Sequence, residues 1–258
     1  MTSRRFPSGP RPPWRAFWKL VATEAKLAVR TPVVLILSVG LPVLMLIIFG
    51  FVPTFNEPLA DLDGLTVLSL YAPILSVFAL GFLGLVGVSM PLAGYREQGV
   101  LRRISCTPAP PSWMLGAQLV INLGVAVLAL LIVNLGIKAF GVSGPKHVGG
   151  YALAIVLCVA AIFGIGLWIA SFARSANVAN AIGQVLFYPM MFFAGLYFPR
   201  EMMPGVLRQV SDWTPLGAAV DALQTAAEGS FPSAQSLLVM AGYALVFGAI
   251  AVKQFKWE

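Results

Sequence analysis

The polar side chains that could do chemistry in this sequence are few, and they form no recognisable catalytic set. His147 is the single histidine and has no set of metal-ligating neighbours around it, so we expect no metal site. No Gly-Lys dipeptide occurs, which excludes a Gly-x-x-x-x-Gly-Lys phosphate loop, and Gly164 and Gly166 do not continue into a dinucleotide-binding pattern. We therefore expect no catalytic residue, no metal and no cofactor bound by this chain.

One stripe of polar side chains stands out between residues 177 and 193. Asn180, Gln184 and Tyr188 recur every four residues and therefore share one face of a helix, with Asn177 at the inner end of that face. Two interpretations stay open. The stripe hydrogen-bonds to a neighbouring helix, or it faces a ligand.

The elements that must carry these groups are membrane helices. Of the 258 residues, 59% are apolar and 10% are charged, which excludes an ordinary soluble enzyme, a disordered chain and a secreted disulfide scaffold. Continuous apolar runs, rather than alternating ones, exclude a β-barrel. Six stretches without Asp, Glu, Lys or Arg exceed the roughly 20 residues that a helix needs to span a bilayer. The six predicted spans of this all-α fold cover residues 33–52, 65–92, 113–137, 151–172, 178–198 and 235–252.

The distribution of charge predicts the orientation of these spans. With both termini on one side of the membrane, 13 of the 17 basic residues fall on that side, which the positive-inside rule identifies as the cytoplasm. The net charge of +7 is then explained by a basic surface next to anionic lipid headgroups, so that nucleic-acid binding is not expected. No charge lies deep in a span, which argues against an ion-coupled carrier.

The segment 14–31 is predicted to be an amphipathic helix on the cytoplasmic surface. Trp14, Phe17, Trp18 and Val21 recur at three- and four-residue spacing, with basic side chains on another face, which is typical of a helix in the headgroup layer. It is either a membrane anchor or a lever that touches a partner protein. Residues 1–13 contain four prolines and are predicted to be a disordered tail.

The loop after the second predicted span is short and rich in functional candidates. It is either a short amphipathic element that docks into a groove of another protein, or a solvated loop that obeys the positive-inside rule. The candidates are Arg96, Glu97, Gly99, Leu101, Arg102, Arg103 and Thr107.

The outward segment 199–233 is predicted to hold a pair of short helices. Apolar residues recur at helical spacing over 202–210 and again over 216–227, and Pro215 lies near the turn between the two. Such a pair can dip into the outer leaflet before the last span, because irregular backbone at that depth must be covered by protein.

Three stretches carry a resemblance to a known family. They are Arg96–Arg103 followed by Thr107-Pro108, Gly195-Leu-Tyr-Phe-Pro199 with Met203-Pro204, and Pro215–Leu223. In this order they resemble the Glu-Arg-Glu-x-Gly-Thr-Leu, Gly-x-x-Phe-Pro and Pro-Leu-x-x-x-Val-Asp-Ala-Leu patterns of ABC-2 transporter permeases, over nearly the whole chain. Tyr95 and Val100 stand where the family commonly has Glu and Thr, and Gln224 where Arg often follows. Roles of those missing residues therefore do not carry over.

The resemblance implies a dimer of identical or different permeases that works with two separate ATPase subunits, on which ATP and magnesium bind. It implies that the loop after the second span is a coupling helix, and that the substrate path lies at the dimer interface between the second and fifth spans. Candidate path residues are Phe78, Phe82, Asn180, Gln184, Phe187 and Tyr188. Pro199, Pro215 and Asp221 mark the outer re-entrant segment.

The expected function is that of the membrane subunit of an exporter in the cell membrane of a bacterium, without enzymatic activity of its own. An apolar path and short outward loops favour a drug, an antibiotic or a lipid as substrate. Export of a polysaccharide or glycolipid ranks second. A sensor or assembly protein that transports nothing is the alternative from another class.

Overall fold

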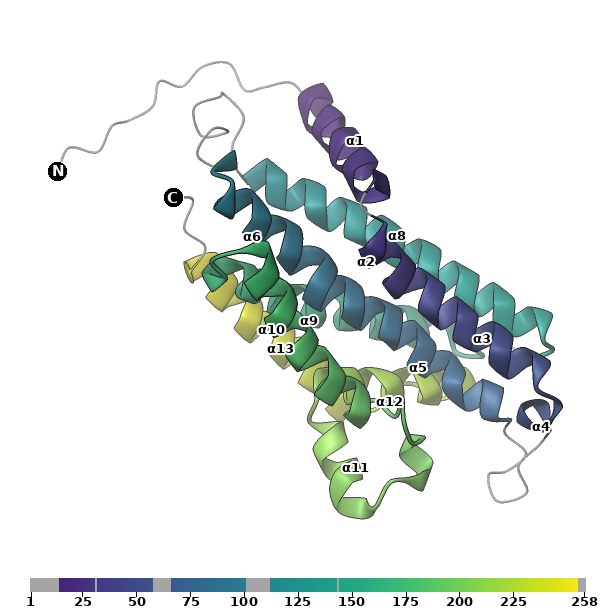
Figure 1. Cartoon of the computed structure of the whole chain (residues 1–258). Coiled ribbons are helices and arrows are strands. Elements are labelled where there is room, and N and C mark those ends of the chain that lie inside the picture. The colour runs from purple at the N-terminus through teal and green to yellow at the C-terminus, as the bar shows by residue number, and fades with distance from the viewer. Residues whose placement is uncertain (1–13, 31, 58–65, 101–111, 143, 255–258) are drawn as a thin grey trace.

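The computed structural model describes residues 14–30, 32–57, 66–100, 112–142 and 144–254, and this part of the chain is helical with short connections and no strand (Figure 1). The predicted tail 1–13 lies outside the described residues. The helices are α1 (Trp14–Arg30), α2 (Val33–Leu35), η1 (Ile36–Gly40), α3 (Leu41–Phe51), α4 (Pro53–Asn56), α5 (Val67–Phe82), η2 (Leu83–Val88), α6 (Ser89–Glu97), α8 (Ser112–Ala139), α9 (Val148–Phe172), α10 (Ala176–Phe193), η3 (Arg200–Met202), α11 (Gly205–Asp212), α12 (Pro215–Glu228) and α13 (Ala234–Gln254).

Five helical runs in the described residues are long and apolar enough to cross a membrane, which makes the chain a multi-pass membrane protein. They are Val33–Phe51, Val67–Glu97, Ser112–Ala139, Val148–Phe172 and Ala234–Gln254. The predicted fifth span corresponds to α10, which has 18 residues and is interrupted by two asparagines, a glutamine and Pro189. The count of six spans and their orientation therefore stay predictions.

The run α5–η2–α6 lies at the centre of the molecule. Of the 18 consecutive residues that make up its most apolar stretch, 94% are buried inside the chain, whereas the corresponding share is 17–50% in the other four runs. It packs on α8, α9, α10 and α12, whereas α1 lies against the outside of the bundle (Figure 1). A span enclosed in this way touches protein on all sides and meets little lipid.

Glycines let the neighbouring helices reach the backbone of this central run. A Cβ added to Gly166 on α9 would lie 2.0 Å from the carbonyl oxygen of Gly84, and one added to Gly183 on α10 would lie 2.7 Å from that of Leu85. Small residues allow such close approach in membranes, where packing rather than the hydrophobic effect holds helices together. Gly84 itself allows the same approach, since a Cβ added to it would lie 2.3 Å from Ile162 Cγ2 on α9.

The centre of the run is a π-helical turn, η2, in which the regular backbone ladder is interrupted. Two side chains donate to carbonyl groups at this turn. The Ser89 hydroxyl donates to the carbonyl of Leu85, and Asn122 Nδ2 on α8 donates to that of Gly87 at 3.3 Å. These bonds satisfy the carbonyls where no water is available to do so.

The two glycine contacts yield a stability prediction. Gly166→Ala should lower the free energy of unfolding by about 1–3 kcal/mol, because the new methyl group would overlap a backbone oxygen that cannot rotate away. Gly124→Ala on α8 is the matched control, since no atom lies within 4 Å of its Cβ position. That change should be neutral or stabilising, because Ala favours helix over Gly. Thermal unfolding of both variants in detergent measures the difference, and equal midpoints would contradict this account of the packing.

Candidate coupling and transport site

Three consecutive residues at the end of α6, Tyr95, Arg96 and Glu97, bind four other helices, and we call them the α6 hub. The Tyr95 hydroxyl donates to Glu24 Oε2 on α1, and Gln118 Nε2 on α8 donates to the same oxygen at 2.7 Å. Glu24 is only 4% exposed. The first link of the hub is therefore a buried carboxylate that ties α1 to α6 and α8.

Arg96 and Glu97 bind the turn between α9 and α10. Arg96 Nη1 donates to the carbonyl of Ser171 in the last turn of α9 at 2.7 Å, and the backbone N–H of Ala176 in the first turn of α10 donates to Glu97 Oε2 at 3.1 Å. Each charge complements the dipole of the helix end that it meets, since cations favour C-termini and anions N-termini. The family resemblance implied that both residues couple to an ATPase, and the structure places both in contacts within the chain.

The predicted coupling segment follows the hub immediately. Gly99 has a φ of +67°, a left-handed conformation that glycine adopts without strain, and the chain turns there. Leu101, Arg102, Arg103 and Thr107 lie outside the described residues. Along the chain, that segment is joined to the α6 hub on one side and to the start of α8 at Ser112 on the other.

The aromatic face of α1 is only partly turned toward the bundle. Phe17 is buried at 9% exposure and meets the Trp113 ring of α8 edge to face at 5.6 Å, and Trp14 stacks on the same ring at 6.4 Å. Trp14 and Trp18 are exposed, and Val21 is half-buried. Together with Glu24, Phe17 fixes α1 to α8, while the two tryptophans remain available to lipid or to a partner.

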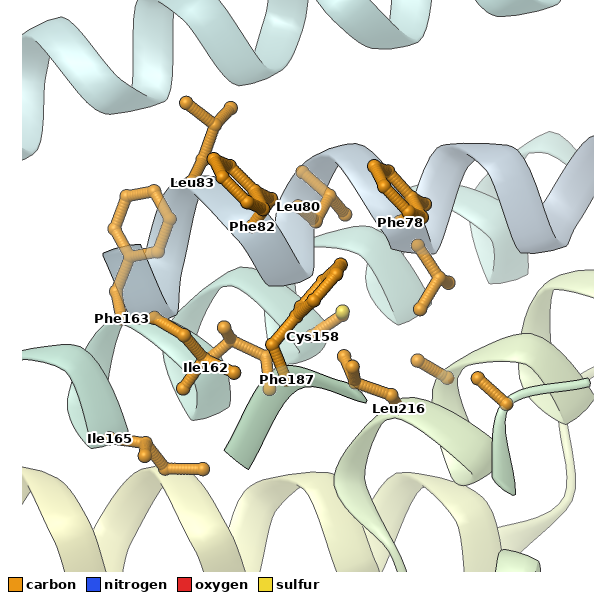
Figure 2. Packing of buried hydrophobic residues seen from close by; sticks show 14 of the residues in the cluster. Phe78, Leu80, Phe82, Leu83, Cys158, Ile162, Phe163, Ile165, Phe187 and Leu216 are labelled. Atoms are coloured by element: carbon orange, nitrogen blue, oxygen red, sulfur yellow. The ribbon is translucent and has the colours of Figure 1, made fainter. Parts of the chain in front are cut away.

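The six candidate path residues do not come together in one site. Phe187 on α10 meets Phe78 and Phe82 edge to face, with ring centres 5.1 and 5.4 Å apart, and all three are buried (Figure 2).

The polar residues among the six path candidates lie elsewhere on α10. Gln184 Nε2 donates to Asn180 Oδ1 at 2.9 Å along the same helix, both side chains are half-buried, and Tyr188 is exposed. The three aromatic rings therefore pack together in the interior of the chain, and the polar stripe lies toward its surface.

The outer segment is held by a buried ion cluster around Arg200, which the sequence analysis missed. The guanidinium of Arg200 is 2% exposed, bonds to the Asp212 carboxylate and to the carbonyl of Gly217, and lies 3.5 Å from Asp221. Asp221 Oδ2 also accepts the hydroxyl of Ser236 on α13 at 2.6 Å. The cluster therefore joins η3, α11, α12 and α13.

In the sequence, the base and the two acids of this cluster lie within one short stretch, and of the three only Asp221 was predicted as a site residue. The two prolines predicted with it lie next to the cluster. Pro199 precedes η3, and Pro215 opens α12 after the side chain of Thr214, which accepts the N–H of Gly217. Helices α11 and α12 occupy the two stretches where short helices are predicted.

Within the described ranges, no group of three or more His, Cys, Asp or Glu side chains is placed to hold an ion.

Comparison with known proteins identifies the family. A family model described as ABC-2 type transporter matches residues 15–227. The chain belongs to the ABC-2 type transporter family. It is also similar to the Bacillus subtilis (strain 168) protein named "Putative transport permease YvfS", with 22% identity over 227 residues that cover 87% of this chain and 90% of that protein. This ABC-2 chain is thus a transporter permease subunit, and permeases of the ABC-2 family normally work with ATPase subunits.

The Arg200 cluster of this ABC-2 permease gives a second prediction. Arg200→Met should lower the free energy of unfolding by about 3 kcal/mol, because two carboxylates lose the cation between them. Adding Asp212→Asn should recover part of the loss, since it removes one unpaired charge. Arg208→Met on α11 is the control, because Arg208 is exposed and makes no ion pair with a described residue. Thermal unfolding in detergent compares the three, and equal effects of the two arginine substitutions would refute a role for the cluster.

Proposed function

We propose that this chain is the membrane subunit of an ABC exporter that moves a hydrophobic or amphiphilic substrate outward, such as a drug, an antibiotic or a lipid. It acts as a dimer, and two separate ATPase subunits that bind ATP and magnesium supply the driving force. The observation that supports this most is the α6 hub, because it binds four helices directly next to the segment where the family couples to its ATPases.

The hub suggests a route for the coupled motion. A push on segment 101–107 moves α6, and Arg96 and Glu97 carry the displacement to the turn between α9 and α10. The run α5–η2–α6 is continuous, so the same push also moves Phe78 and Phe82 on α5. A difference between the movements of α5 and α10 separates Phe187 from those two rings.

Opening of this aromatic cluster exposes an apolar surface. Such a surface favours an amphiphilic substrate over a polysaccharide, which requires a more polar lining. The Asn180 and Gln184 amides, near the same helix face as Tyr188, lie outside the closed cluster and are available to a substrate or to the second subunit.

Coupling is tested with the chain co-expressed with its ATPase. Leu101→Asp should weaken the ATPase contact and lower ATP hydrolysis by the complex. Glu97→Ala should lower the amount of substrate moved per ATP by roughly fivefold, since the lost helix-end contact contributes about 1 kcal/mol. Glu57→Ala is the control, as an exposed carboxylate outside the hub. Unchanged hydrolysis and transport in both test variants would sink the coupling role.

The polar stripe has its own test. In a reconstituted complex, Asn180→Leu combined with Gln184→Leu should change the relative transport rates of chemically different substrates by several-fold, whereas Val185→Leu on the exposed side of α10 should not. If the double variant changes only the stability of the dimer, the stripe is a helix-packing element and not part of the path.

A further inference from the structure

We propose that a cavity at the opposite end of the central run binds a zwitterionic phosphate–ammonium group, the headgroup of phosphatidylethanolamine. This site is independent of ATP-driven export and requires only that the chain lies in a membrane. None of the residues in the α6 hub, the aromatic cluster or the Arg200 cluster lines it.

The cavity has a volume of about 380 Å³ and lies where several helices end. Its wall comes from the start of α5, the last turns of α8, the start of α9 and the end of α12. Helix ends of membrane spans lie at the depth of the lipid headgroups, and this volume falls in the range of small-ligand sites. The polar lining residues on which the argument depends are Thr66, Ser69, Asn134, Lys146, Gln224 and Glu228.

One donor in this cavity is unsatisfied. The Nε2 atom of Gln224 is buried and has no hydrogen-bond partner among the described residues. The neighbouring polar groups already have other hydrogen-bond partners. Thr66 and Ser69 bond to each other in a capping box, and Asn134 Nδ2 donates to the carbonyl of Leu130 at 2.8 Å. A buried donor without an acceptor costs about 1–3 kcal/mol, which an ester carbonyl or phosphate oxygen of a ligand would recover.

Two opposite charges line the same cavity. The N–H of Lys146 donates to the carbonyl of Ala227 at 3.4 Å, which fastens the segment before α9 to the end of α12, next to Glu228. Both side chains are exposed, and neither makes an ion pair with a described residue. A site with one base and one acid has no net charge, so it matches a zwitterion better than an anionic lipid. Lys146 suits the phosphate and Glu228 the ammonium.

Native mass spectrometry of the delipidated chain in detergent tests the site, with phosphatidylethanolamine and phosphatidylglycerol of identical acyl chains as probes. The wild type should retain the zwitterionic lipid roughly fivefold more than the anionic one. Gln224→Leu should reduce retention of both lipids by about fivefold, as expected for one lost hydrogen bond to a charged or ester oxygen. Glu228→Gln leaves a net positive site and should shift the preference toward phosphatidylglycerol. Glu57→Gln, which removes an acid outside the cavity, should change nothing.

Soluble glycerophosphoethanolamine, a phosphodiester without net charge like the lipid headgroup, distinguishes the two sources of this chemistry. Displacement of the lipid by it assigns binding to the headgroup alone, and persistence of the lipid adduct shows that the acyl chains contribute. Equal retention of both lipids by the wild type would overturn the proposal. An unchanged lipid preference in the Glu228→Gln variant would overturn it as well. Because Glu228 is exposed, this variant should fold even if Gln224→Leu does not, and the test stays valid.

Discussion

The approach of α9 and α10 to the backbone of the central run is the contact on which the rest of this structure depends. Lipid tails are as apolar as the side chains, so helices in a bilayer gain little from burying apolar area and must gain from close packing. Gly166 meets Gly84, and Gly183 meets Leu85, at distances that leave no room for a methyl group. These contacts enclose the second span and set its register against both neighbours.

The buried charged groups lie at the two ends of the bundle, away from its centre. At one end the carboxylate of Glu24 is buried between Tyr95 and Gln118, and at the other Arg200 is buried between Asp212 and Gly217. Burial of a charge is tolerated only where hydrogen bonds and opposite charges satisfy it. Each cluster therefore specifies which surface helices dock there: α1 at the first, and α11 and α12 at the second.

The centre of the molecule has the opposite character. Phe78, Phe82 and Phe187 meet edge to face without a charged group near them, and the contact depends on shape and weak attraction alone. Edge-to-face pairs contribute about 1 kcal/mol each beyond the area they bury, so they separate at modest cost. An apolar centre between firmly bonded ends suits the proposed exporter, in which the ends transmit force and the middle opens.

The sequence by itself determined the membrane class, the helical fold, the amphipathic α1, the two short outer helices and the family. These follow from composition, periodicity and local motifs, which act over a few residues. Tertiary structure alone decided which partner each polar group meets. Arg96 and Glu97 bind the ends of α9 and α10, and Asp212 and Asp221 bind Arg200, because charged groups near a bilayer bind the helix end or opposite charge that the packing brings within reach. No local sequence pattern encodes these pairings: the partners of Arg96 and Glu97 lie 75 and 79 residues away in the chain, and only the packing of the helices brings them together.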